Sequence, residues 1–272
     1  MKFPDHFEAD MAQHLAFAEE NAGNYASASP FAHTMIDDFV KPDVLETVWQ
    51  ELSDSGDKKW GHMNDSDQNK FATANTAQMG PATRALIQFL NGQEMMGFLE
   101  ALTAIEGLIP DPQLAGGGLH ELRSGGFLRV HADFNFQPHL RLDRRINLLL
   151  YLNKDWDESY GGNLELWDED MTACQKRYAP NFNRCVIFNT TDRSFHGNPE
   201  PVAAPDGRTR RSIAMYYYTN GRPADEVSSD HMTLFHKRPG ELSASDKSKL
   251  VAKRWLPPAV YDMLQGLKSG AK

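Results

Sequence analysis

The pattern of apolar and polar positions divides the chain into a helical first part and a β-rich second part. Helical spacing of apolar residues predicts helices over 5–20, 42–52 and 81–107, the last one interrupted at Asn91-Gly92. After Pro110 the pattern changes to short apolar runs separated by turn residues, which is typical of strands. The predicted strands are 126–130, 146–152, 163–167, 184–189 and 212–219. Helices followed by a block of strands predict an α+β fold with an antiparallel sandwich or barrel.

Two other segments have patterns of their own. Residues 53–80 are polar and predict one long loop, either disordered or a functional flap. Near the C-terminus, a capping pattern predicts a helix over 245–255, and a last short helix is predicted over 259–267. We therefore expect an N-terminal support region of the same domain at 1–110, a β-rich core at 111–222 and a C-terminal helical extension at 223–272.

Composition places the chain among soluble globular proteins. It has 272 residues, of which 40% are hydrophobic, and a formal net charge of −9. A negative net charge argues against a sequence-independent grip on nucleic acid, which needs a basic surface. The N-terminus has acidic residues where a secretory signal is apolar, no apolar run has the length of a membrane span, and the two cysteines form no disulfide framework. We expect a cytoplasmic protein that binds neither nucleic acid nor membrane.

One strand end carries a candidate metal motif. The run GGFLRVHADFN at 125–135 ends a predicted strand with His131 and Asp133. Alternate strand residues share a face, so these two side chains point the same way, either as a surface pair or as two ligands of a metal. His196 follows the apolar strand 184–189 and is the candidate third ligand. Two histidines and one carboxylate leave three positions of an iron ion open, which suits Fe(II) and O₂ chemistry.

The last predicted strand carries a candidate anion-binding group. Arg210 opens this strand and shares a face with Ser212. A buried arginine needs an anionic partner, and a carboxylate matches its planar fork. An inward Arg210 therefore predicts an acidic small molecule beside the metal, with Tyr151 as a further donor to the same carboxylate. A register shifted by one residue would give this position to Arg211 instead.

The order of these motifs resembles the 2-oxoglutarate-dependent Fe(II) oxygenases, and among them the prolyl 4-hydroxylase-like branch. The shared features are the His-x-Asp pair, the distal histidine and the Arg-x-Ser that opens the following strand. The stretch YLNKDWDESYGGNLELW at 151–167 is similar to the branch's segment after its second core strand. The resemblance is closest over about 120–220. It implies a double-stranded β-helix, which is a distorted jelly roll, with flanking helices mainly from the N-terminal part.

The resemblance also implies roles for single residues. The implied iron ligands, which are also the catalytic residues, are His131, Asp133 and His196, and the implied 2-oxoglutarate-binding residues are Arg210, Tyr151 and Ser212. Leu122 departs from the pattern, because many members have a tyrosine nine positions before the first histidine. His120, on the same strand face, or a water molecule is the candidate replacement for that tyrosine.

The activity implied by the resemblance is that of a dioxygenase. It uses Fe(II), 2-oxoglutarate and O₂, with ascorbate as a candidate reductant, and hydroxylates an unactivated C–H bond while succinate and CO₂ are released. The expected substrate is a prolyl or similar residue in a peptide or protein, and the loops at 53–80 and 134–145 are expected to form the substrate mouth.

Other functions are open at this point. Within the same chemistry, the alternative substrates are a free amino acid, a natural-product intermediate or another small molecule such as a glycan. Outside it, the alternatives are a non-catalytic jelly-roll binding module and a cupin-type metalloenzyme. A cupin would not require the Arg-x-Ser strand, and a complete set of three ligands disfavours the inert module.

Overall fold

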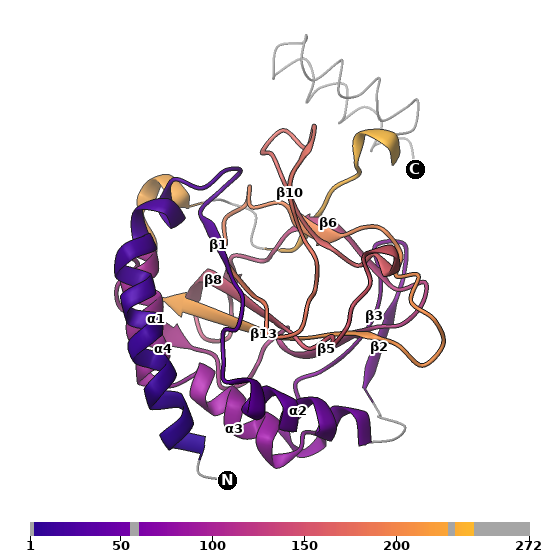
Figure 1. The fold of residues 1–272 in the computed structure, drawn as a ribbon. Helices are drawn as coiled ribbons and strands as arrows, with labels where there is room; N and C mark the ends of the chain where they lie inside the picture. Colours follow the sequence, from indigo (N-terminus) through magenta and orange to yellow (C-terminus); the bar gives the residue numbers. More distant parts are fainter. Residues whose placement is uncertain (1–2, 55–59, 228–231, 242–272) are drawn as a thin grey trace, which may run out of the picture. The chain divides into compact units, whose positions relative to one another are not determined.

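An antiparallel sheet that curls into a nearly closed barrel dominates the computed structural model (Figure 1). The structure describes residues 3–54, 60–227 and 232–241. The chain divides into two compact units, Met1–His236 and Lys237–Lys272. In the second unit the described part ends at Glu241 and contains the 3₁₀ helix η4 (Pro239–Glu241).

The described residues contain four α-helices and fourteen strands. The α-helices are α1 (Phe3–Ala26), α2 (Pro42–Asp54), α3 (Pro81–Leu90) and α4 (Gln93–Thr103). The strands are β1 (His33–Ile36), β2 (Gly61–Asn64), β3 (Gln68–Thr73), β4 (Ile109–Pro110), β5 (Gly118–Leu122), β6 (Phe127–Ala132), β7 (Phe136–Gln137), β8 (Leu142–Tyr151), β9 (Leu164–Trp167), β10 (Cys174–Tyr178), β11 (Cys185–Asn189), β12 (His196–Asn198), β13 (Arg210–Thr219) and β14 (Leu234–Phe235). Three further 3₁₀ helices are η1 (Thr76–Gln78), η2 (Glu158–Tyr160) and η3 (Ala224–Glu226).

The strand order explains how the sheet curls. The main path runs β1-β11-β8-β13-β5-β3-β6-β12-β9-β10. Strand β3 pairs with both β5 and β6, so it joins the two halves of the sheet. At the two ends of the path, His33 Nε2 of β1 lies 2.8 Å from the Tyr178 hydroxyl of β10. The interior is therefore enclosed by strands on nearly all sides, which leaves little exposed strand edge.

Alternation along β8 separates the outer core from the interior. Ile146, Leu148 and Leu150 point outward and belong to the same buried apolar cluster as residues of all four helices. The helices lie against this outer face, beside β8 and β13 (Figure 1). Asn147 and Tyr151, with the opposite orientation, point into the barrel. The apolar face is therefore covered, and the polar residues of the same strand are left to build an internal site.

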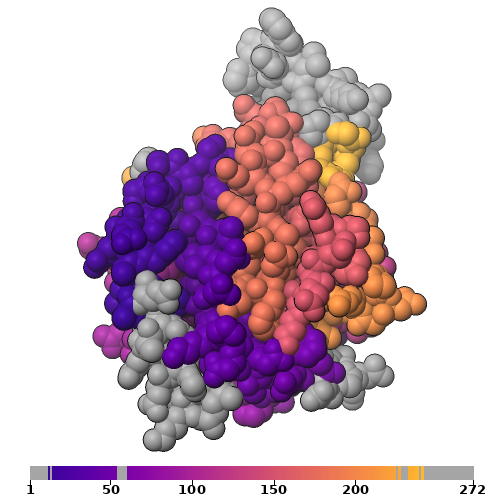
Figure 2. Space-filling view, viewed as in Figure 1, coloured from indigo at the N-terminus to yellow at the C-terminus, as the bar shows by residue number. Residues whose placement is uncertain are grey.

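The N-terminal part is integrated with the sheet. Strand β1 pairs antiparallel with β11, with His33 opposite Phe188. On the face shown in Figure 2, the indigo N-terminal segments lie directly beside the salmon and orange segments of the second half of the chain. The division at residues 110 and 222 stays a prediction.

Most predicted elements are confirmed, but the long loop is wrong. The helices predicted from 5, 42 and 81 correspond to α1, α2 and the α3–α4 pair, and all five predicted strands are present. Residues 53–80 instead contain the hairpin of β2 and β3. Its residues are mostly polar apart from Met63, Phe71 and Ala72, so the regular apolar alternation that predicts a strand is missing.

The segment 134–145 is likewise not one loop, since it contains β7 and the start of β8. Strands β10 and β12 were not predicted, because each is short and largely polar in sequence. The predicted C-terminal helices lie outside the described residues. Where the structure describes the chain, none of its helices combines the length and apolarity needed to cross a membrane.

Candidate metal and co-substrate site

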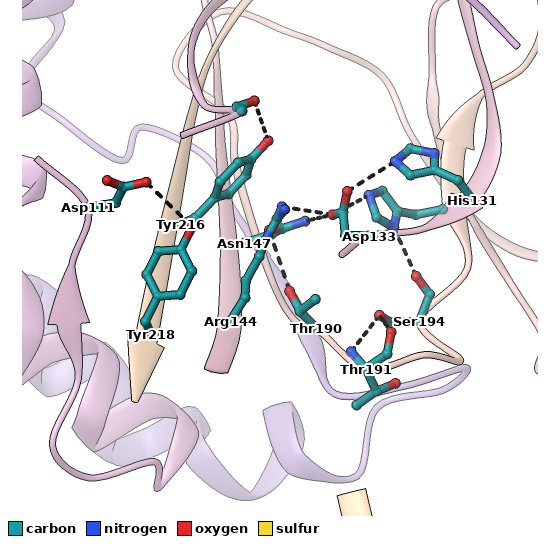
Figure 3. Close-up of polar contacts among 12 residues, drawn as sticks. Asp111, His131, Asp133, Arg144, Asn147, Thr190, Thr191, Ser194, Tyr216 and Tyr218 are labelled. Atoms are coloured by element: carbon teal, nitrogen blue, oxygen red, sulfur yellow. Dashed lines mark hydrogen bonds and ion pairs between the residues drawn. The ribbon is translucent and has the colours of Figure 1, made fainter. Parts of the chain in front are cut away.

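Two paired strands bring the three predicted ligands together. Strands β6 and β12 are antiparallel neighbours with His131 directly opposite His196, and Asp133 follows the end of β6. One donor atom from each of the three side chains lies within 4.8 Å of the others. Figure 3 shows Asp133 with His131 on one side and with Arg144 and Asn147 on the other.

The backbone fixes which nitrogen of each histidine is free. His131 Nδ1 lies 2.8 Å from the Arg129 carbonyl oxygen, and His196 Nδ1 lies 2.9 Å from the Ser194 carbonyl oxygen. A carbonyl oxygen only accepts, so each Nδ1 carries a proton and donates it, and in the neutral ring Nε2 is then the nitrogen with the free lone pair. The two Nε2 atoms face the Asp133 carboxylate, each at 3.3 Å from one of its oxygens. Burial, together with the nearby His196, lowers the pKa of His131 and favours its neutral, metal-binding form.

The carboxylate of Asp133 is held by a buried guanidinium. Arg144 donates from Nη2 to Asp133 Oδ2 at 2.8 Å, and Asn147 Nδ2 donates to the same oxygen at 2.6 Å. Burial by itself would raise the pKa of Asp133, but Arg144 and the neighbouring histidines hold it well below its usual range. Asp133 is therefore ionised and oriented before any cation binds.

Aromatic rings hold Arg144 in turn. Its guanidinium carbon lies 3.3 Å from the ring centroid of Tyr216 and 4.6 Å from that of Phe134. The Tyr216 hydroxyl donates to the Gly116 carbonyl oxygen at 3.0 Å, so the ring itself is anchored. With 1% of its side chain exposed, Arg144 behaves as part of the interior rather than as a surface cation.

These residues fit Fe(II). Two imidazole nitrogens and one carboxylate would hold such a cation from one side and leave positions for other ligands. Their outer hydrogen bonds to carbonyl oxygens and to Arg144 are the kind of support that metal-binding histidines and carboxylates have in proteins.

A cavity leads from these three ligands to Arg210. Its walls are formed by Lys70, His120, Leu122, Leu128, His131, Asp133, Asn147, Leu149, Leu164, His196, Gly197, Asn198, Arg210, Ser212 and Tyr216. Arg210 is buried and donates from Nε to the Gly162 carbonyl oxygen at 2.6 Å. Its Nη2 lies 3.4 Å from the hydroxyl of the fully buried Tyr151. Arg211 points to the opposite face, where its Nε donates to Glu121 at 2.9 Å, so the register places Arg210 in the cavity.

The position that departs from the related oxygenases lies next to Arg210. Leu122 of β5 is directly opposite Arg210 in the register, and it offers no hydrogen bond. His120, one inward position further along β5, is opposite Ser212 and lines the cavity. Burial, with a smaller contribution from Lys70, lowers the pKa of His120 to about 3. The imidazole of His120 is therefore neutral at physiological pH.

Several residues of the site were missed from the sequence. Asn147 shares the inward face of β8 with the predicted Tyr151, and Asn198 shares the inward face of β12 with His196, so alternation alone could have identified both. Arg144 carries no such signal, because its partner Asp133 lies in another segment. Lys70 was missed because its strand had been predicted as a loop.

Comparison with known proteins agrees with this geometry. Residues 117–218 match the sequence model of the 2OG-Fe(II) oxygenase superfamily. Prolyl 3-hydroxylase OGFOD1 of Mus musculus is 34% identical over 79 residues, which is 28% of this chain and 14% of the mouse protein. The Xenopus laevis protein of the same name is 32% identical over 79 residues, or 28% of this chain and 15% of that protein.

Solved structures share the fold. A prolyl-4-hydroxylase from Pseudomonas putida superposes with a TM-score of 0.54 at 16% identity, covering 76% of this chain and 100% of that one. A prolyl hydroxylase from Trichoplax adhaerens, solved with a hypoxia inducible factor peptide fragment, gives a TM-score of 0.53 at 16% identity and covers 80% and 93% of the two chains. The expected α+β class and double-stranded β-helix are confirmed. Residues 117–218 thus match the 2OG-Fe(II) oxygenase superfamily, and they lie in a unit that shares the fold of these prolyl hydroxylases.

Proposed function

We propose that this protein is a 2-oxoglutarate- and Fe(II)-dependent dioxygenase that hydroxylates a prolyl or similar residue in a peptide or protein. One observation carries the proposal: a cavity has His131, Asp133 and His196 at one end and the buried Arg210 at the other. A dianionic 2-oxo acid fits such a cavity, because one carboxylate can meet Arg210 while the keto acid end reaches the metal.

The residues of the chain prepare this reaction by position and charge. His131, Asp133 and His196 would hold Fe(II), which supplies the one-electron and O₂ chemistry when bound. Arg144 keeps Asp133 ionised, and the two backbone carbonyl contacts keep both Nε2 atoms free. The buried walls exclude water around the reacting groups and orient the co-substrate.

Arg210 would orient the co-substrate from the far end of the cavity. Its Nε donates to the Gly162 carbonyl oxygen, and this hydrogen bond orients the guanidinium so that its other nitrogens can bind the co-substrate. The Tyr151 hydroxyl lies beside Nη2 and adds a donor that a bound carboxylate can share. Ser212 lines the same wall and provides a short hydroxyl donor.

The substrate class rests on the relatives. The curated relatives are named prolyl 3-hydroxylases, and two structural neighbours are prolyl hydroxylases, one of which was solved with a peptide. Because the match covers a small share of the mouse protein, the substrate comes to this chain as a proposal. A cytoplasmic location is likewise proposed, from the acidic composition and the free cysteines.

The test of the chemistry is succinate formation. Anaerobically purified protein is mixed with Fe(II) and 2-oxoglutarate, O₂ is admitted, and succinate is measured against His131→Ala. We expect succinate from the wild type and none above background from the variant. Arg210→Met should raise the 2-oxoglutarate requirement by about 10- to 100-fold, as expected for hydrogen bonds between charged groups, whereas Arg211→Met should leave it nearly unchanged.

The test of the substrate is the position of the new hydroxyl group. A library of proline-containing peptides is incubated with the active protein, and a mass increase of one oxygen identifies substrates. Acid hydrolysis and chromatography then separate 3-hydroxyproline from 4-hydroxyproline. Succinate formation without hydroxylation of any peptide would leave the oxygenase chemistry standing and refute the prolyl assignment.

A further inference from the structure

A second cationic side chain reaches the cavity from a strand outside the recognised motifs. Phe71 of β3 pairs with Glu121 of β5, so the adjacent Lys70 lies beside Leu122. Leu122 in turn lies opposite Arg210 of β13. Lys70 and Arg210 therefore flank Leu122 on neighbouring strands, at one level of the barrel, and both line the cavity.

The charge of Lys70 is not compensated by a contact. In the described part of the chain, its ammonium group has no hydrogen-bond or ion-pair partner within contact distance. The charges of Asp133, Arg144 and Arg210 act on it over a longer range. Burial, partly offset by the attraction of Asp133, lowers the pKa of Lys70. A half-buried cation without a contact partner is partly desolvated in the free protein, and an anionic ligand offsets that cost.

An unpaired amide faces the same space. Asn198 follows His196 by two positions on β12, is 5% exposed and lines the cavity. Its Nδ2 atom is buried without a hydrogen-bond partner among the described residues. Buried amide groups are normally satisfied, so this donor indicates a ligand acceptor that the protein itself does not supply.

The direction of the strands places both groups on the Arg210 side of the metal ligands. His196 pairs with His131, and Asn198 pairs with Leu128, so β12 runs from the metal ligands along the cavity wall. Gln68 of β3 pairs with the same Leu128, which brings β3 beside this wall. The wall between the metal ligands and Arg210 thus carries two donors, Lys70 and Asn198, beyond those in the family pattern.

We propose that Lys70 is a second anchor for the distal carboxylate of 2-oxoglutarate, with Asn198 as an additional donor. Lys70 supplies the contact that Leu122 cannot make at the position where many related oxygenases have a tyrosine. A carboxylate between an ammonium group and a guanidinium group accepts charge-assisted hydrogen bonds from both sides. This inference rests on the proposed function, since it assumes that 2-oxoglutarate is the co-substrate.

The test is a binding measurement without turnover. Protein loaded with Mn(II) is titrated anaerobically with 2-oxoglutarate and with 2-oxopentanoate, which has a methyl group in place of the distal carboxylate. Lys70→Met should weaken binding of 2-oxoglutarate by about 10- to 100-fold and change binding of 2-oxopentanoate by less than about twofold. Asn198→Ala should weaken 2-oxoglutarate binding by about 2- to 10-fold.

Controls separate binding from folding. Lys176→Met, on the exposed face of β10, should leave both affinities unchanged. Lys70→Arg keeps the charge and should bind 2-oxoglutarate more tightly than Lys70→Met. The metal-free Lys70→Met protein should unfold at the same temperature as the wild type or at a higher one, because the variant removes a partly desolvated cation that has no contact partner. A lysine with a merely structural role would give a lower unfolding temperature.

The outcomes are distinct. Unchanged 2-oxoglutarate binding in Lys70→Met overturns the inference and leaves the proposed function intact. Equal weakening of both acids also overturns it, because Lys70 would then act at the keto acid end. If the wild type binds neither acid, the proposed function fails and the inference fails with it.

Discussion

Replacing Arg144 by methionine tests whether the proposed metal ligands are held in position in the absence of metal. The variant removes the guanidinium that donates to Asp133 Oδ2 at 2.8 Å and keeps an apolar side chain of similar length. Asp133 then stays buried with Asn147 as its remaining donor to that oxygen. Removing one member of a buried ion pair costs about 3–5 kcal/mol, because the other charge is left without compensation.

The loss has a second part that does not involve Asp133. Arg144 lies 3.3 Å from the ring centroid of Tyr216, and the loss of a desolvated cation–π contact costs about 2 kcal/mol or less. A double-mutant cycle with Asp133→Asn separates the two parts. In that background Arg144 has already lost its anion, so its removal should cost no more than about 2 kcal/mol.

The assay is urea unfolding of metal-free protein in the presence of a chelator, followed by circular dichroism. In a parallel thermal unfolding experiment, the same loss of about 3–5 kcal/mol corresponds to a fall in Tm of roughly 6–20 °C for a protein of this size, at about 2–4 °C per kcal/mol. Arg193→Met is the matched control, because Arg193 pairs with Glu169 while both side chains are largely exposed, and such surface pairs contribute about 0–1 kcal/mol. Equal losses from Arg144→Met in the wild-type and Asp133→Asn backgrounds would refute the proposed pairing.

Two further predictions concern pH and helix capping. Folding lowers the pKa of His120 to about 3 from an ordinary value of 6.5. Between pH 6.5 and pH 3, His120 therefore binds a proton in the unfolded chain but not in the folded one, so the stability falls as the pH drops through this range. The slope from this group approaches 1.4 kcal/mol per pH unit, and His120→Gln should flatten the measured pH dependence of unfolding where the exposed His139→Gln does not. The Glu51 carboxylate accepts hydrogen bonds from the backbone N–H groups of Ala82 and Thr83, at 2.7 and 2.9 Å, at the start of α3. Glu51→Ala should therefore lower the free energy of unfolding by about 1–2 kcal/mol, with the exposed Glu19→Ala as control, and a loss no larger than that of the control would contradict this capping role.

Local pattern accounts for much of the fold. Alternation along 146–152 and 212–219 separated the outward apolar residues from the inward Tyr151, Arg210 and Ser212, because a strand side chain has only two faces to choose from. The same rule paired His131 with Asp133. The hairpin at 61–73 was not predicted, because its residues are mostly polar without regular alternation and the strands that β3 joins lie far along the chain.

The sequence by itself determined the strand faces, the His-x-Asp pair, His196 as the candidate third ligand and the resemblance that implied a role for each candidate residue. The tertiary structure alone decided which distant segments meet. It set His131 opposite His196, placed Arg144 against Asp133, and brought Lys70 and the unpaired Asn198 amide to one cavity. These meetings depend on cross-strand register and on closure of the sheet by β3, which no local periodicity encodes.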